Sequence, residues 1–138
     1  MSLPDTKAFR AALRTYLLAG ASVAAKLGTR LWWVRAEQRP ARPFAVMSII
    51  TTTSDQTHDS PVSLQLARVQ IDVFADTAAV AADTLEAIKA RMAAINHTTV
   101  SAVIIEWAHL DNEIDGWDDD PSEYRITCDY NIYHQTAA

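Results

Sequence analysis

The sequence predicts an α+β domain in which a mainly antiparallel sheet of four to five strands packs against two main helices, with a projecting hairpin or loop. Two segments carry apolar residues at helical spacing, and the C-terminal segment alternates apolar and polar residues. The apolar stripe of each helix needs a cover, which the apolar face of an antiparallel sheet supplies. No linker divides the 138 residues, so we expect a single domain over residues 1–138.

The N-terminal segment predicts a helix, because apolar residues recur at i, i+4, i+7 and i+8. These residues are Phe9, Leu13, Tyr16 and Leu17. Gly20 is the expected end of this helix. Ser22 can cap a second, short helical turn that ends at Gly28.

Two strands are predicted next, over Leu31–Val34 and Phe44–Thr53. Between them, Arg35–Pro43 holds two prolines and three arginines and is expected to form a loop. The polar residues 54–63 have the composition of an exposed connection. We therefore expect this connection to form the tip of a hairpin.

The segment Leu64–Ala75 alternates again, but the parity of its apolar positions changes near Ala67. A bulge near Ala67, or a hairpin whose base alone joins the sheet, would account for the change. Asp76 can then cap a long helix. The apolar stripe of that helix is formed by Leu85, Ile88, Met92 and Ile95.

Two further strands, Val100–Leu110 and Glu123–His134, are predicted on either side of an acidic segment, Asp111–Asp120. The last strand is well specified, because apolar side chains occupy every second position from Tyr124 to Ile132. The acidic segment is interpreted as an exposed loop or an interface patch, which is the usual role of a charge run.

Charge is distributed unevenly along the chain. Residues 1–42 hold eight of the twelve Lys and Arg residues and two acidic ones, a net charge of +6. Residues 43–138 hold four basic and fifteen acidic residues, a net charge of −11. Such asymmetry indicates either internal pairing of faces or an interface between copies.

The sequence contains no apolar run approaching the roughly 20 residues of a membrane span, and no signal peptide, so we expect a cytosolic protein without a membrane partner. Cys128, the only cysteine, excludes an internal disulfide. It falls among the inward residues of the last strand and is assigned to the core.

Candidate chemistry is sparse in this sequence. Asp111, Glu113 and Asp115 fit the first positions of a calcium-binding loop, but Ser122 stands where such a loop needs a bidentate Glu. The four histidines are scattered without metal-ligand spacing, and no nucleophile elbow or phosphate-binding glycine loop occurs. We therefore expect no catalytic residue, no metal site and no cofactor.

Several motifs together resemble one family. They are a Val-Ala-Ala-x-Leu-Gly turn at Val23–Gly28, an aromatic strand before a Pro-containing loop, an alternating segment at Ala67–Ala75, an Ala-rich helix, and a tail at Asp120–Ile126. In this order they resemble the tail-terminator, or tail-completion, proteins of long-tailed bacteriophages (siphophages) and related gene-transfer particles.

The resemblance implies a structural protein of the virion that assembles in the host cytoplasm and is not an enzyme. It implies a hexameric ring, closed in some cases only on the tail tube, that caps the head-proximal end of the tube and stops its polymerisation. The implied partners are the tail tube protein and a neck or head-completion protein. Genomic DNA would pass through the lumen without specific binding.

A closed ring needs two complementary patches on each subunit. We expect Arg35, Arg39 and Arg42 of one subunit to meet the acidic run Asp118, Asp119 and Asp120 of its neighbour, with Trp32 as an aromatic interface residue. The expected loop for docking on the tube or neck consists of Ser54, Asp55, Gln56, Thr57, His58, Asp59 and Ser60.

Two other functions fit the same sequence. Within phage assembly, the chain could be another neck, connector or tail tube component. From a different class, it could be a small-ligand-binding or hydrolytic α+β domain, which would need a closed apolar pocket with convergent polar groups. A stand-alone nucleic-acid binder is disfavoured by the sequence pI of about 5.2.

Overall fold

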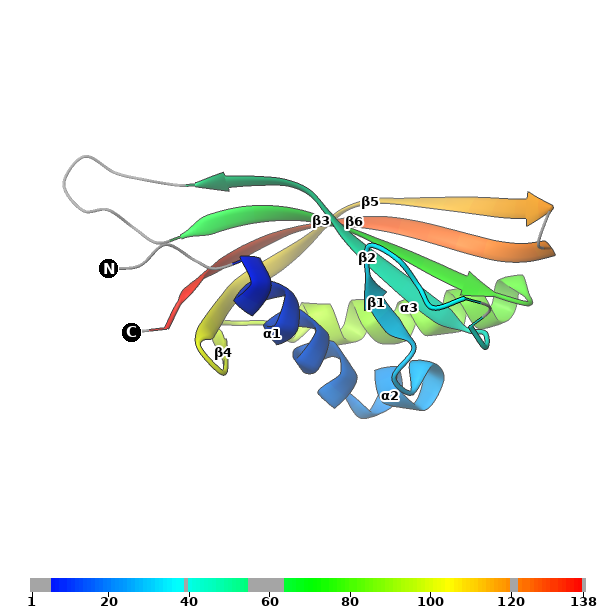
Figure 1. The fold of residues 1–138 in the computed structure, drawn as a ribbon, viewed down its shortest axis with the longest axis horizontal. Coiled ribbons are helices and arrows are strands. Elements are labelled where there is room, and N and C mark those ends of the chain that lie inside the picture. Colours follow the sequence, from blue (N-terminus) through cyan, green and yellow to red (C-terminus); the bar gives the residue numbers. More distant parts are fainter. Residues whose placement is uncertain (1–5, 39, 55–63, 120–121, 138) are drawn as a thin grey trace.

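The computed structural model describes residues 6–38, 40–54, 64–119 and 122–137. In this part of the chain, three helices lie on one face of a six-stranded sheet (Figure 1). The helices are α1 (Thr6–Ala19), α2 (Ala21–Leu27) and α3 (Ala78–Ala93). The strands are β1 (Leu31–Trp33), β2 (Phe44–Ser54), β3 (Gln65–Ala75), β4 (Thr98–Val100), β5 (Val103–Asp119) and β6 (Ser122–Thr136). The predicted α+β class is confirmed, with two main helices, the expected short helix between them in the sequence, and one strand more than the four to five expected.

The sheet has the order β1-β2-β3-β6-β5-β4, and only β1 runs parallel to its neighbour. In Figure 1, β2 and β3 extend beyond the helices at one end of the sheet, and β5 and β6 extend at the other. The short edge strands β1 and β4 pair with only a small part of β2 and β5. Among the described residues, much of β2 and of β5 therefore has no strand partner on its outer side.

Glycines separate the first two helices and end the second. Gly20 follows α1 as expected, but it also occupies the N-cap of α2, so the prediction that Ser22 caps this helix was wrong. Gly28 ends α2 with a φ of 60°, and its N–H donates to the carbonyl of Ala24 at 2.8 Å. This left-handed conformation is one that glycine adopts without a Cβ penalty.

Helix α3 begins one residue later than expected. Thr77, and not Asp76, is the N-cap, and its Oγ1 accepts a hydrogen bond from the N–H of Val80 at 3.1 Å. The predicted stripe is confirmed for Leu85, Ile88 and Met92, which are almost fully buried, whereas Ile95 is buried but follows the end of α3. These side chains face the sheet under β3 and β6.

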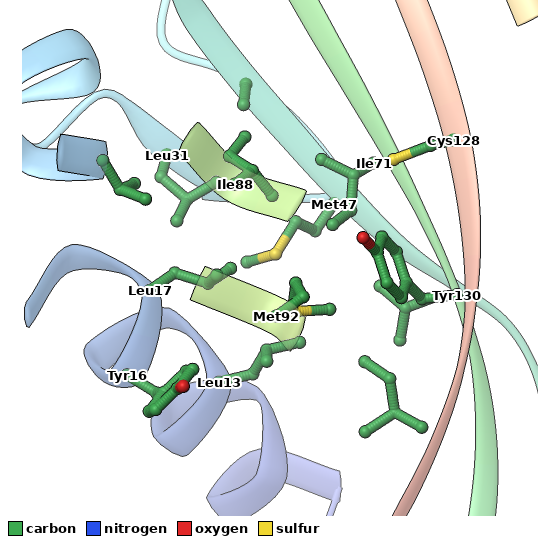
Figure 2. Packing of buried hydrophobic residues seen from close by; sticks show 14 of the residues in the cluster. Leu13, Tyr16, Leu17, Leu31, Met47, Ile71, Ile88, Met92, Cys128 and Tyr130 are labelled. Atoms are coloured by element: carbon green, nitrogen blue, oxygen red, sulfur yellow. The ribbon is translucent and has the colours of Figure 1, made fainter. Parts of the chain in front are cut away.

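The core lies between the helices and the sheet. Figure 2 shows Leu13 and Leu17 of α1 and Met92 of α3 directed toward side chains of the sheet such as Met47 and Ile71. All of these side chains are at most 1% exposed. Burial of each apolar side chain of this size contributes about 1.5–3 kcal/mol to folding, which makes this layer the main source of stability.

Two strand predictions need correction. Strand β3 pairs regularly past Ala67, and the register shift lies on the neighbouring strand β2 between Ile49 and Thr51. The apolar Leu66 simply faces away from the helices. The segment predicted as one strand over Val100–Leu110 contains a tight turn at Ser101 and Ala102, so it forms β4 and the beginning of β5.

Candidate functional site

The acidic segment is not a loop. Strand β5 continues through it to Asp119, and with β6 it forms a long antiparallel hairpin that we call the acidic arm (Asp111–Asp119 and Ser122–Asp129). A register shift between Leu110 and Asn112 marks the start of the arm. An extended strand cannot wrap its carboxylates around one cation as a calcium loop does. Among the described residues, no group of three or more His, Cys, Asp or Glu side chains is placed to hold a metal ion.

The carboxylates of the arm point to both faces of the sheet. On the face away from the helices, Asp118 lies 3.7 Å from Arg125 and Asp111 lies 3.5 Å from Arg68. On the helix side, Glu113 accepts a hydrogen bond from Lys89 of α3 at 3.0 Å. Hydrogen bonds from Lys89 to Glu113 and Glu86 raise the pKa of Lys89, so the arm is tied to α3 by a charged pair.

A groove separates the tip of the arm from the first turns of α3. Its volume is about 540 Å³, and it is open to solvent along one side. The walls are mainly apolar and are formed by Ala78, Ala81, Ala82, Trp117, Tyr124 and Ile126, with Asp115, Gly116 and Arg125 completing the lining. Trp117 and Tyr124 are 48% and 38% exposed, so the groove presents unburied aromatic surface.

Of the three arginines predicted for the subunit interface, the structure describes two. Arg35 is exposed, whereas Arg39 falls outside the described residues. Arg42 pairs within its own subunit with Asp76 at 2.8 Å and with Glu123 at 3.0 Å. The hydrogen bond to Asp76, followed by the charge of Glu123, raises the pKa of Arg42.

The other predicted interface residues are only partly placed. Trp32 is half-buried, and its ring meets Phe44 edge-on at a centroid distance of 6.1 Å. Asp119 accepts a hydrogen bond from the indole of Trp117 at 2.6 Å. Asp120 lies outside the described residues.

Of the predicted docking loop, Ser54 is the exposed last residue of β2. The other six residues, Asp55, Gln56, Thr57, His58, Asp59 and Ser60, lie outside the described part of the chain. Ser54 and Gln65 are paired at the end of the β2–β3 hairpin. The structure therefore fixes where this connection leaves the sheet.

A polar network that sequence reasoning missed covers the face of the sheet away from the helices. Asp129 accepts hydrogen bonds from Arg68 and Asn112 at 3.3 and 3.2 Å. Asp72 accepts from Thr127 and Gln70 on the same face. In the sequence, these residues are the polar positions of each alternating strand. Alternation places them on the open face of the sheet, but it does not show which of them pair across strands.

Glu106 and His97 form a second pair at the β4–β5 end of the sheet. His97 Nδ1 lies 2.8 Å from Glu106, and Gln135 donates to the other carboxylate oxygen at 2.6 Å. Burial alone would raise the pKa of Glu106, but the hydrogen bonds with His97 and Gln135 outweigh it and lower this pKa. These contacts link the residue before β4 to β5 and β6.

The buried reactive groups are not poised for chemistry. Cys128 is fully buried, as predicted, and burial raises the pKa of its thiol to about 12. Its thiol is therefore protonated at neutral pH and unsuited to nucleophilic attack. Burial likewise raises the pKa of Tyr130 well above its usual value.

None of the helices in the described residues has the length and apolar character that a membrane span requires.

The fold and these surfaces define a small α+β protein, a two-layer scaffold with a projecting acidic arm and an open, mainly apolar groove. The family model described as Tail completion protein gp17 matches residues 11–135. The chain belongs to this family. It is therefore a structural protein of phage-type tails, and membership in such a family favours a role without catalysis.

Solved structures share the fold. A chain of the virion of a native gene transfer agent particle superposes with a TM-score of 0.69 at 16% identity, covering 91% of this chain and 93% of that one. A second solved chain gives a TM-score of 0.53 at 10% identity, covering 89% and 94%. A search of curated proteins gives no match. The likeness to the two structures concerns the fold alone.

Proposed function

We propose that this protein is a tail terminator, a ring-forming subunit that caps the head-proximal end of the tail tube, stops tube polymerisation and provides the joint to the head or neck. The observation that carries the proposal is membership in the tail-completion family over residues 11–135. The fold shared with a chain of a gene transfer agent virion supports placement in a particle of this kind.

The shape of the subunit supports a ring. A ring is built from heterologous contacts, in which one surface of a subunit meets a different surface of the next. This subunit ends in the short strand β1 at one edge of its sheet and carries the acidic arm near the other edge. Two dissimilar edges meet the requirement, whereas a two-fold dimer would need one self-complementary patch.

The partners in this proposal are other copies of the chain, the tail tube protein and a neck or head-completion protein. The β2–β3 connection, including Ser54–Ser60, is proposed to dock on the tube or neck, because it leaves the sheet at the end opposite to the acidic arm (Figure 1). The net charge of −5 per subunit disfavours specific binding of the DNA that crosses the lumen. The protein assembles in the host cytoplasm and remains in the virion.

The charged residues predicted for the subunit interface remain proposals. Arg35, Arg39 and Arg42 are proposed to face the acidic run Asp118–Asp120 of a neighbour, with Trp32 close to the contact. Arg42 also acts inside its own subunit, where it holds the start of β6 to the β3–α3 connection through Glu123 and Asp76. Its contribution to a ring is to position the arm.

Electron microscopy of particles produced without this gene tests the proposal. A tail terminator limits tube growth, so its deletion should give overlong tails without heads, and expression of the gene in trans should restore a uniform length. Absence of tails would identify a tube component instead. Tails of normal length that fail to join heads would identify a neck or connector protein.

A further inference from the structure

We propose that a trough between α3 and the strand β5 is a docking site for a basic amphipathic helix of a different polypeptide. One side of α3 and the helix-facing side chains of β5 form its walls, and β6 forms its floor. The trough is defined by Ala82 and Ala93 of α3, Leu110, Glu113 and Trp117 of β5, and Tyr130 of β6. The inference goes beyond the proposed function, because it concerns a partner other than a second copy.

The trough consists of two hollows in line. The first is the groove of about 540 Å³ beside the N-terminal turns of α3. The second, of about 360 Å³, lies further along the same helix and is lined in part by Ala93, Leu110 and Tyr130. Between the hollows, Lys89 of α3 donates to Glu113 of β5 at 3.0 Å. Both hollows therefore follow the same side of α3.

The helix layer has room for a further helix at this place. α3 packs against the adjacent strands β3 and β6. Strands lie about 4.8 Å apart and packed helices about 8–10 Å apart, so the next position in the layer lies about two strands further on, at β5 and its outer side. In the described part of the chain, Glu113, Asp115 and Trp117 on this side of β5 are exposed. The trough therefore corresponds to a helix position that the described helices do not occupy.

The shape of the trough suits a helix. α3 presents alanines, whose small side chains let a second helix approach closely. Trp117 and Tyr124 meet edge-on at a centroid distance of 4.6 Å and offer exposed aromatic surface to apolar side chains. Ala93 lies about three helical turns after Ala82, roughly 16 Å along the axis. A docked helix therefore needs apolar residues at i and i+4 for the larger hollow and at i+11 for the smaller one.

The charge of the trough favours a basic partner. Asp115 and Asp119 lie two residues before and after Trp117 and therefore share its face of β5. Together with Glu113 and with Glu86 of α3, they place negative charge along the trough. Lys89 is already paired with Glu86 and Glu113.

Arg125 does not cancel this charge. Its guanidinium lies on the other face of the sheet, 3.7 Å from Asp118. The favoured occupant is therefore an apolar stripe flanked by Lys or Arg.

A second copy of the chain has no suitable helix for this site. In the described residues, α1 buries its apolar stripe, including Leu13 and Leu17, in its own core, and α3 does the same with Ile88 and Met92. α2 has 7 residues, too few to span both hollows. The occupant is therefore a helix of another protein.

Synthetic peptides test the site on the purified full chain. Two alanine-based helices of about 18 residues carry lysines beside a leucine stripe. One has its leucines at i, i+4 and i+11, and the other, for a helix that docks in the opposite direction, at i, i+7 and i+11. One of the two should bind with a Kd on the order of 10 µM, measured by fluorescence anisotropy of the labelled peptide.

A charge-reversed peptide is the control. Replacing the lysines of the bound peptide by glutamates should weaken binding at least about tenfold. Absence of binding by both lysine peptides at about 1 mM, or equal binding of the glutamate version, overturns the inference.

Substitutions in the trough locate the contact. Ala82→Arg fills the larger hollow from an exposed helical position, so it should weaken peptide binding at least about tenfold and leave α3 folded. The matched control Ala11→Arg places the same side chain on the exposed face of α1 and should have no effect. Trp117→Ser should also weaken binding, whereas Trp107→Ser, at nearly equal exposure on the opposite face of the sheet, should not. Unchanged binding in both Ala82→Arg and Trp117→Ser contradicts the proposal.

Sedimentation of the protein alone decides between a foreign helix and a second copy. A ring built through other surfaces should form equally in the parent and in Ala82→Arg. Loss of self-association in Ala82→Arg but not in Ala11→Arg would show that a second copy fills the trough, and the inference would be wrong. None of these results changes the tail length that tests the proposed function, so the two can fail independently.

Discussion

The two faces of the sheet use different means to hold the same strands. On β3, the residues toward the helices, from Ala67 to Ala75, are all apolar and completely buried. The residues between them, such as Arg68 and Asp72, face the other side and pair with polar groups of the neighbouring strands. The stability of the covered face therefore comes from close packing of apolar side chains, and that of the open face comes from paired charges and hydrogen bonds.

The difference shows where each face is sensitive to change. A cavity in the covered face costs the lost apolar contacts whatever the pH or salt concentration. On the open face, removal of one partner matters most where the remaining group is poorly solvated. Glu123 and Asp129 are such groups, because they are only 7% and 9% exposed.

The largest effect is expected from the covered face. Ile71→Ala should lower the free energy of unfolding by about 4 kcal/mol, because Ile71 is fully buried between β3 and the helices. Gln70→Ala, one residue earlier on the open face, should cost less than about 1 kcal/mol. Urea denaturation of both variants measures the contrast, and equal losses would mean that the two faces do not differ as described.

Acid should destabilise the covered face through His134. Its ring is 2% exposed and stacks on Phe9 at 3.9 Å, and burial lowers its pKa to about 4 from an ordinary value of 6.5. The unfolded chain binds the proton first, so stability is complete above pH 6.5 and falls toward pH 4 by up to about 3 kcal/mol. Thermal melts should show a flatter acid response in His134→Phe than in the parent.

An intermediate effect is expected at Arg42. Arg42→Ala leaves the buried carboxylate of Glu123 without its cation and should destabilise the fold by about 2 kcal/mol. Adding Glu123→Gln removes the uncompensated charge and should restore part of this loss. If Glu123→Gln lowers the free energy of unfolding by the same amount in the parent and in Arg42→Ala, the two residues are not coupled.

The smallest effect is expected at the pair between β3 and β6. Thr127 Oγ1 donates to Asp72, which also accepts from Gln70. A double-mutant cycle with Thr127→Val and Asp72→Asn should give a coupling energy of about 1 kcal/mol, because the site is partly solvated. A coupling near zero would show that this part of the open face contributes no specific pairing.

Periodicity predicted most of the fold. The stripes of α1 and α3 and the alternation of β6 were confirmed, because each pattern reflects one buried face. The wrong predictions concern segments whose composition is unusual for the structure that they adopt. The carboxylates of Asp111–Asp119 have low intrinsic strand preference, yet pairing with Ser122–Asp129 of β6 draws this segment into β5.

The candidate site was less accessible to sequence reasoning. The alternation of the last strand predicted Tyr124 on the buried face, yet it is 38% exposed, and nothing local in the sequence indicates that the N-terminal end of α3 faces Trp117 and Tyr124 across a groove. Arg42 was predicted to face a neighbour because it belongs to a run of arginines. The long-range contacts with Asp76 and Glu123, which only the fold brings close, give it an internal role that was not predicted, and its contact with a neighbour stays a prediction.

The junction of α1, α2 and α3 has an evolutionary consequence. A side chain at Gly20 would place its Cβ 2.8 Å from Cδ of Arg91, and Arg91 is itself held over the ring of Tyr16 by hydrogen bonds in both directions. Positions 16, 20 and 91 should therefore diverge together among homologues. A lineage that gains a larger residue at position 20 is expected to carry a shorter one at position 91.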